Sequence, residues 1–132
     1  GKKAETFGNP NALHSYTYVT DFGEALVRLA LDERSLGRGW HVPNAPAVTN
    51  AEFLARVAAI AGVPAKSVRR SAFQLRLAGL FIPPAREIIE MLYEFEHDFV
   101  VDHSAYAAVF GDHATPLDES LAATVAWWRQ HS

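Results

Sequence analysis

The chain has 132 residues, of which 49% are apolar and 20% charged, a composition typical of one globular domain with a buried core. Its formal net charge of −3 and the lack of a long basic run argue against a nucleic-acid-binding surface. The absence of cysteine excludes disulfides, thiolate catalysis and cysteine-ligated zinc sites. No apolar run approaches the roughly 20 residues of a membrane-spanning helix, and no signal-peptide pattern opens the chain. We therefore expect a cytoplasmic protein without a membrane or nucleic-acid partner.

The opening residues predict a short extended piece followed by a turn. The run from Gly1 to Leu13 contains Gly8-Asn9-Pro10-Asn11, and these residue types in succession are typical of a turn. The chain starts without a methionine, so we expect a processed or truncated beginning.

Residues 14–44 predict a strand, a helix and a second strand. Tyr16 to Val19 alternate aromatic and β-branched residues, which favours a strand. Thr20-Asp21 then predicts a helix cap, with Glu24 in the capping-box position three residues after the aspartate. Trp40 to Pro43 is the second strand candidate. Between the strands, apolar residues recur at helical spacing, at Phe22, Ala25, Leu26, Leu29 and Ala30.

A strand–helix–strand unit of this kind normally has parallel strands. A parallel sheet needs several strands and cover on both of its faces. The rest of the chain predicts too few parallel strands to build such a sheet. The strand–helix–strand unit is therefore expected without the parallel sheet that it would normally join.

Residues 49–70 predict a capped helix and a short edge strand. Thr49-Asn50-Ala51-Glu52 matches a capping box, and Gly62 is the predicted C-terminal cap. Lys66 to Arg70 is either a polar connection or an edge strand. One face of the helix carries the apolar residues Phe53, Leu54, Val57 and Ile60.

The following residues predict further helix and one more strand. A helical pattern at Phe73, Leu77 and Leu80 precedes a helix from Ala85 to about His97. Phe99 to Val101 then predicts a short strand.

Two helices are predicted to end the chain. The first spans Ser104 to Phe110, with Asp102 as its cap and Gly111 at its end. The second begins at Thr115-Pro116, a capping residue followed by a proline suited to the first helical position. Its inner face is Leu117, Leu121, Val125 and Trp128. Together the elements predict a helix-rich α+β fold.

The sequence lacks the common motifs of cofactor binding and covalent catalysis. Gly37-Arg38-Gly39 has no third glycine of the dinucleotide fingerprint, and no Walker loop or Gly-x-Ser-x-Gly elbow occurs. No tyrosine is followed by a lysine four residues later, so a Tyr/Lys acid–base pair cannot form within one helix. We therefore predict no catalytic and no cofactor-binding residue.

One cluster has the residue types of metal ligands. It straddles a helix end without a His pair at i, i+4 spacing, and acids at a solvated helix end explain it more simply. We predict no metal site there. The cluster is Glu94, Glu96, His97, Asp98, Asp102 and His103.

Single polar residues near the strands have a structural and a functional interpretation. A lone histidine beside a strand, as His14 and His41 are, is more often a surface or hydrogen-bonded residue than a catalyst. We interpret Asp21 as a helix cap rather than a catalyst. The aromatic residues are expected mostly in the core.

Three stretches, in order and in spacing, cover nearly the whole chain. They are His14 to Ala25 (HSYTYVTDFGEA), then Gly39 to Asn44 with Val48 to Phe53 (GWHVPN and VTNAEF), and last Asp102 to Gly111 with Thr115 to Trp127 (DHSAYAAVFG and TPLDESLAATVAW). Taken together they resemble the C-terminal portion of the extended short-chain dehydrogenase/reductase family, the NAD-dependent epimerase/dehydratase group. The first is similar to that family's Tyr-x-Val-x-Asp-hydrophobic-Ala junction, and the third to its Asp-x-Ser…Glu-x-Leu-x-x-Thr-Val-x-Trp ending.

The resemblance implies that residues 1–132 are a single C-terminal substrate-binding region of a Rossmann-type α/β enzyme. In the family, the N-terminal Rossmann domain holds NAD or NADP and the catalytic residues, and this sequence contains none of that domain. Residues 14–44 would pack against the missing domain. His14 and Tyr16 are the expected contacts to a small-molecule substrate, a sugar or another carbonyl or hydroxyl compound. His14 stands where nucleotide-sugar enzymes often have arginine, which argues against a nucleotide-diphosphate sugar.

Two readings of the function follow. The parent protein would be an NAD(P)-dependent epimerase, dehydratase or reductase, in which this segment alone binds no cofactor and performs no redox step. The alternative is a non-enzymatic helix-rich interaction module, or an NAD(P)-sensing regulator of the same fold. A homo-oligomer is expected in either case because apolar surface meant for a neighbour would be uncovered.

Overall fold

The computed structural model describes residues 4–70, 89 and 91–131. About half of these residues are helical and the strands are short, so the fold is a mixed α+β fold. This agrees with the helix-rich α+β class expected from the sequence.

The chain forms two compact units, and each is built from two separate stretches of sequence. The first unit contains the described residues of Gly1–His14 and Val48–Phe99. The second contains those of Ser15–Ala47 and Val100–Ser132. The chain therefore passes from one unit to the other at three places.

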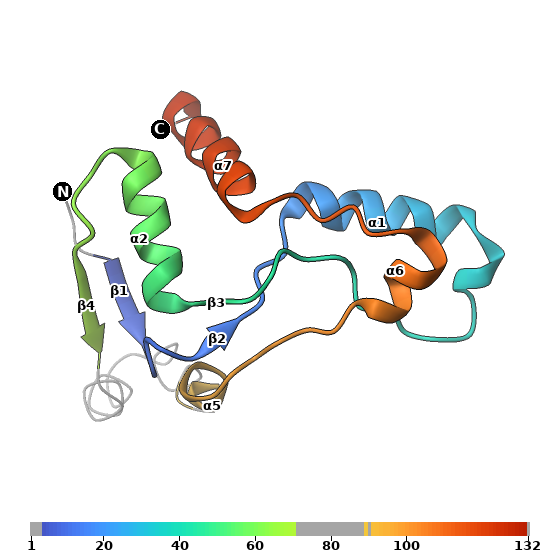
Figure 1. Cartoon of the computed structure of the whole chain (residues 1–132), viewed down its shortest axis with the longest axis horizontal. Helices are drawn as coiled ribbons and strands as arrows, with labels where there is room; N and C mark the ends of the chain where they lie inside the picture. Colours follow the sequence, from blue (N-terminus) through green and yellow to red (C-terminus); the bar gives the residue numbers. More distant parts are fainter. Residues whose placement is uncertain (1–3, 71–88, 90, 132) are drawn as a thin grey trace. The chain divides into compact units, whose positions relative to one another are not determined.

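The first unit contains a two-stranded parallel sheet. Strand β1 (Ala4–Phe7) pairs with β4 (Ser67–Arg70), and the register runs from Ala4 opposite Ser67 to Phe7 opposite Arg70 (Figure 1). The extended piece and the edge strand expected from the sequence are thus confirmed. The parallel pair is this one, and not a pair within residues 14–44.

Helix α2 (Asn50–Ala61) precedes β4 in the second stretch of the first unit, and both of its ends form as the sequence predicts. The Thr49 hydroxyl accepts from the Glu52 N–H at 3.1 Å, and the Glu52 carboxylate accepts from the Thr49 N–H at 3.0 Å. Gly62 ends the helix with a φ of 69°, and its N–H donates to the carbonyls of Ala58 and Ala59. A left-handed residue at this position suits glycine because it has no Cβ.

The chain crosses between the units next to His14, Val48 and Phe99, and these three residues are paired through their backbones. Strand β2 (Leu13–His14) pairs antiparallel with β3 (Val48–Thr49), and His14 also forms a parallel bridge with Phe99. The strand expected at Phe99 to Val101 is therefore reduced to this single bridge. Most of the two helices expected between residues 73 and 97 lies outside the described residues, apart from helix α5 (Leu92–Glu96).

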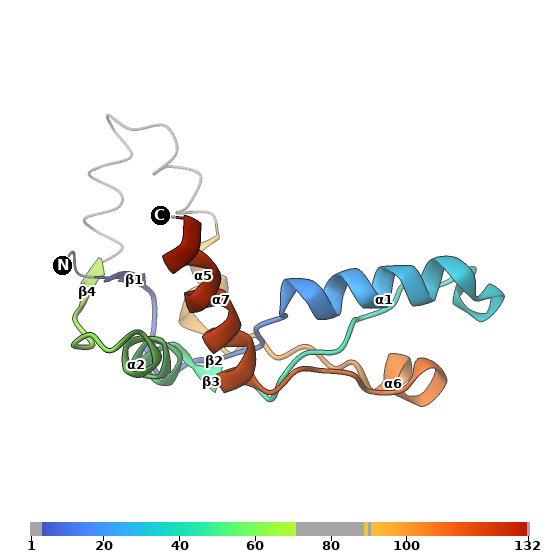
Figure 2. The same cartoon turned by 90° about the horizontal axis from the view of Figure 1, so that it is seen from above.

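The second unit consists of helices and the loops between them. Helix α1 (Val19–Leu31) and the 3₁₀ helix η1 (Glu33–Ser35) come from its first stretch, and α6 (Ser104–Phe110) and α7 (Leu117–His131) from its second (Figure 2). The bounds predicted for α6 are confirmed, including its end at Gly111. Buried side chains of this unit include Asp21, Ala25, Pro43, Asn44, Ala45, Tyr106, Ser120 and Leu121.

The two strands predicted within residues 14–44 are wrong. The described residues 15–18 and 40–47 have no strand, and Val19 already belongs to α1. The Trp40 indole N–H donates to the Ser35 carbonyl at 2.8 Å, and its ring meets Phe110 edge-on at 5.1 Å. Side-chain anchoring therefore holds this segment, and Pro43 has no N–H to donate to a ladder.

The expected cap and inner face of α1 also need correction. The helix starts after Tyr18 without a side-chain cap, so Asp21 lies inside its first turn. Ala25 is fully buried, but Phe22 is 45% exposed and Leu26 is 50% exposed. In the same way Trp128, expected on the inner face of α7, is 59% exposed. These helices carry apolar surface that the second unit does not cover.

Candidate functional site

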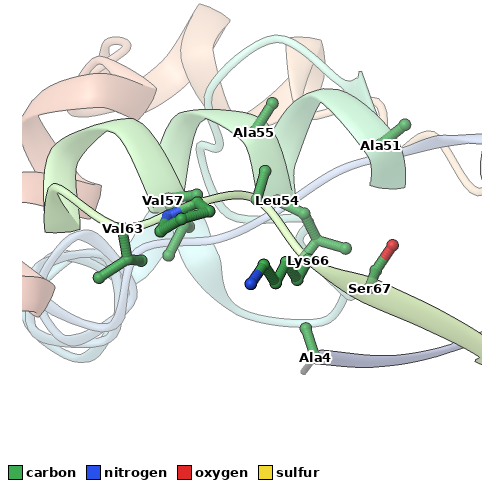
Figure 3. Close-up of a pocket in the computed structure, with 11 residues that line it drawn as sticks. Ala4, Ala51, Leu54, Ala55, Val57, Val63, Lys66 and Ser67 are labelled. Carbon is green, nitrogen blue, oxygen red and sulfur yellow. The ribbon is translucent and has the colours of Figure 1, made fainter. Parts of the chain in front are cut away.

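A hollow in the first unit lies between α2 and the strands β1 and β4 (Figure 3). Its volume is about 350 Å³, and nearly all of its lining is aliphatic. Lys66 and Ser67 are the polar residues of that lining. The surface is suited to apolar packing, and it does not bring together groups that could orient a polar ligand.

A second hollow, within the second unit, brings polar side chains together. Its volume is about 400 Å³, and its walls are formed by Ser15 and by residues 44–47, 100, 101, 103, 112 and 114–116. Alanine, valine and proline form most of these walls, and Asn44, His103 and Asp112 provide hydrogen-bonding groups. Apolar walls with a few converging polar groups are the usual form of a small-molecule site. We therefore take this hollow as the candidate site.

His103 lies between an amide and a carboxylate. The Asn44 Nδ2 is 3.3 Å from His103 Nδ1, and His103 Nε2 is 3.5 Å from the Asp112 Oδ2. The same Asn44 Nδ2 is 3.2 Å from the Val42 carbonyl, which can only accept. The Asn44 amide is therefore oriented with its NH₂ toward both groups, so Nδ1 of neutral His103 accepts and Nε2 carries the proton. The ring points that N–H at Asp112.

Asp112 is held as a carboxylate at the edge of the hollow. Its Oδ1 accepts from the Ala114 N–H at 3.0 Å. This backbone hydrogen bond, together with the neighbouring His103, lowers the pKa of Asp112 below its ordinary value. Its side chain is 56% exposed, so one face of the carboxylate is accessible from solvent.

Two further contacts fix the walls next to His103. The Asp102 Oδ1 accepts from the Ser104 N–H at 2.8 Å, and this bond lowers the pKa of Asp102. His41 Nδ1 lies 3.0 Å from the Asp102 carbonyl, so its N–H donates a hydrogen bond to that oxygen. The loop that carries Asn44 and the segment that carries His103 are thus bonded to one another. Asp102 thus bonds the first residue of α6, but the N-cap residue of that helix is His103, so the prediction of Asp102 as its cap is wrong by one residue.

Thr115, which lines the hollow, is hydrogen-bonded to the buried residue Asp21. Asp21, only 4% exposed, accepts from both the N–H and the hydroxyl of Thr115, each at 2.7 Å. His113 Nε2 lies 3.2 Å from the Asp21 carbonyl. The sequence interpretation of Asp21 as the cap of its own helix is therefore wrong, because its carboxylate binds a segment more than 90 residues later.

The two substrate contacts expected from the resemblance belong to different units. His14 is in the first unit, where its ring stacks on Phe95 at 6.3 Å and its backbone pairs with Val48. Tyr16 is half-buried in the second unit, and this burial raises the pKa of its hydroxyl. The candidate hollow is lined by the residue between them, Ser15. A substrate role for His14 and Tyr16 stays a prediction.

Sequence reasoning found parts of the hollow without assembling them. The sequence places Asp102 and His103 in the cluster of metal-ligand residue types, and Asn44 only in the second of the stretches that resemble the family. Polar side chains such as Asn44 and Asp112 carry no local pattern that separates a buried partner from a surface residue. The one usable signal is that Asn44, Asp102 and His103 lie in the stretches that carry the family resemblance, whereas Asp112 falls between two of them.

Metal and membrane features were sought among the same residues. Within residues 4–70, 89 and 91–131, no group of three or more His, Asp or Glu side chains could hold a metal ion. In that part of the chain no helix combines the length and the apolar character needed to cross a bilayer.

Strand β1 is not followed by a helix. After β1 the chain turns at Gly8 and Pro10 and continues into β2, so no helix starts at the end of the parallel strand. Pyrophosphate binding in dinucleotide folds needs a helix N-terminus at that position.

No family model matches the chain, and no curated protein matches it.

Proposed function

We propose that this chain is the substrate-binding C-terminal region of an NAD(P)-dependent epimerase, dehydratase or reductase of the extended short-chain dehydrogenase/reductase family. The proposal rests on the three stretches that resemble that family. Its strongest support is that residues of the three stretches are hydrogen-bonded to one another in the second unit.

Residues of all three stretches are bonded to one another around the candidate hollow. Asp21 of the first stretch binds Thr115 of the third. His41 and Asn44 of the second lie against Asp102 and His103 of the third. Stretches that resemble a single substrate domain would be expected to assemble in this way. Their convergence is the single observation that carries the proposal.

Uncovered surfaces support a neighbouring nucleotide-binding domain. Among the described strands, β1 and β4 form a parallel sheet of only two strands, and such sheets are normally larger and covered on both faces. Phe22 and Leu26 of α1 expose about half of their surface. In the proposed enzyme the nucleotide-binding domain covers such surfaces, holds NAD or NADP and supplies the groups for hydride transfer. The present chain supplies walls that orient the substrate.

The coding sequence upstream of Gly1 tests the proposal directly. We expect a strand with a glycine-rich turn, followed later by a Tyr-x-x-x-Lys motif, within about 150 to 200 residues, the length of one nucleotide-binding domain. If neither motif is present, the proposal is wrong.

Kinetics of the complete enzyme test the two expected substrate contacts. His14→Ala and Tyr16→Phe should each raise the Michaelis constant for the substrate. Thr17→Ala, on the exposed residue that directly follows Tyr16, is the matched control and should leave it unchanged. Unchanged Michaelis constants and turnover in both variants would remove these residues from the site.

The exposed stripe of α1 also supports a second candidate, a non-enzymatic interaction module or NAD(P)-sensing regulator. Large exposed apolar patches usually mark interfaces. Val19, Phe22 and Leu26 follow one another at helical spacing, and each is at least 45% exposed. We expect the chain to self-associate and to bind an apolar dye, and Phe22→Gln with Leu26→Gln to reduce both. A strict monomer in light scattering that binds no dye would contradict a docking role for this stripe.

A further inference from the structure

The hollow of the first unit exists because one face of α2 carries small side chains. Ala51, Ala55 and Ala58 follow one another at helical spacing, and all three line the hollow. Their methyl groups leave a space of about 350 Å³ between the helix and residues 63–67. We call this space the α2 groove. From Ala51 to Ala58 it runs for roughly 10 Å along the helix.

One cation lies in this otherwise uncharged groove. Lys66 is the only charged residue of the described lining, and no Asp or Glu is among those residues. Its side chain runs along α2 and away from Ser67 (Figure 3). The methylene stem of a lysine packs on apolar surface while its ammonium presents three donors. The electrostatic complement of the groove is therefore an anion.

The apolar walls and the single charge together narrow the choice of ligand. A small inorganic anion leaves the aliphatic walls without a partner, and an uncharged hydrocarbon covers the ammonium without pairing it. A ligand with an aliphatic chain and one anionic end satisfies both features. A carboxylate carries a single charge and so matches the single ammonium, whereas a phosphate monoester carries nearly two. Burial of the chain against Leu54 and Ala58 supplies the driving force, and the ion pair sets its direction.

We propose that the α2 groove binds an unbranched aliphatic carboxylate of medium chain length. The chain lies along Ala51, Leu54 and Ala58, and the carboxylate accepts from the Lys66 ammonium. Every residue of this site belongs to the first unit, so the inference does not depend on the proposed function.

Titration of the full chain with octanoate, at concentrations below those at which it forms micelles, tests the proposal. The amide signals of Leu54, Ala58 and Ser67 are followed by NMR, with octanol, octylammonium and butyrate as matched probes. We expect saturable shifts of these amides with octanoate. Octanol and butyrate should bind several-fold more weakly because each lacks one of the two contacts, and octylammonium should bind most weakly. Absence of saturable shifts at these amides, or any matched probe binding as tightly as octanoate, would overturn the proposal.

Three variants assign the binding to the groove. Lys66→Met keeps an aliphatic stem and removes the charge, so octanoate affinity should fall about fivefold while octanol affinity stays the same. Ala55→Leu, at an exposed position of the lining, should weaken the binding of both by filling the groove. Arg56→Met removes a cation from the same helix outside the described lining and should leave octanoate binding unchanged. Equal octanoate affinity in Lys66→Met and Arg56→Met, with circular dichroism showing both folded, would overturn the pairing with Lys66.

Discussion

Asp21 and Thr115 are joined by two hydrogen bonds of 2.7 Å, one from the backbone N–H and one from the hydroxyl of Thr115. The carboxylate is buried, and its two donors lie 94 residues later in the chain. This pair ties the first turn of α1 to the segment that enters α7. Its loss would leave donors unpaired where water has little access.

We predict that Asp21→Ala destabilises the second unit by about 2–4 kcal/mol, because both Thr115 donors lose a charged acceptor. Asp21→Asn should cost less than half as much. Its amide oxygen can accept from the Thr115 N–H, and its NH₂ can donate to the hydroxyl oxygen. All three tryptophans belong to the second unit, so tryptophan fluorescence during urea unfolding measures this change.

A double-mutant cycle with Thr115→Val checks that the pair is responsible. We expect a coupling energy of about 1–3 kcal/mol between residues 21 and 115. Additive losses would mean that Asp21 acts through other contacts.

The capping box of α2 provides a prediction for the first unit. Thr49→Ala removes the acceptor of the Glu52 N–H and should destabilise the helix by about 1 kcal/mol. Hydrogen exchange of the first α2 amides should then be about fivefold faster. The control is Thr17→Ala, which changes an exposed threonine outside any helix. Equal exchange in both variants would contradict the role of the box.

Gly8 and Gly62 have nearly the same backbone conformation and different surroundings. Their φ angles are 66° and 69°, but a Cβ on Gly8 would lie 2.2 Å from the Phe95 carbonyl oxygen, whereas the space at Gly62 is open. Gly62→Ala should cost about 1–2 kcal/mol, for the left-handed conformation alone. Gly8→Ala should cost about 1–3 kcal/mol more, because backbone must move. Hydrogen exchange of amides in the first unit measures both; equal losses would mean that the Phe95 contact is not made.

The pH dependence of Asp112 tests the geometry of the candidate site. Its pKa is lowered by the Ala114 N–H and then by His103. The stability it contributes is therefore complete above the unfolded aspartate pKa of about 3.9, and it is lost as the pH falls through the lower folded value. Carboxyl ¹³C NMR should show a titration midpoint below that of a free aspartate.

His103→Gln is the matching variant. It should move the Asp112 midpoint upward without restoring the free value, because the Ala114 hydrogen bond remains. A midpoint that does not move would mean that His103 and Asp112 do not interact in solution.

The sequence alone predicted correctly the helix ends that depend on residues only a few positions apart in the chain. The capping box at Thr49 follows from side chains that bond to the backbone at their own helix end, and the C-terminal ends of α2 and α6 follow from Gly62 and Gly111. The α+β class follows in the same way from the periodicity of apolar residues. Each of these features is fixed by atoms close together in the chain.

Tertiary structure decided what the sequence left open or predicted wrongly. Asp21 has the pattern of a helix cap, yet a distant threonine supplies two better donors. Trp40 to Pro43 has strand-like residues, yet the indole is bonded to Ser35 and packed on Phe110 instead of a ladder. The hollow at His103 exists only because residues far apart in sequence converge on it. Hydrogen bonds and packing between distant segments have no local signature. The sequence alone therefore determined the ends of α2 and the extent of α6, but not the site that the loops of the second unit form.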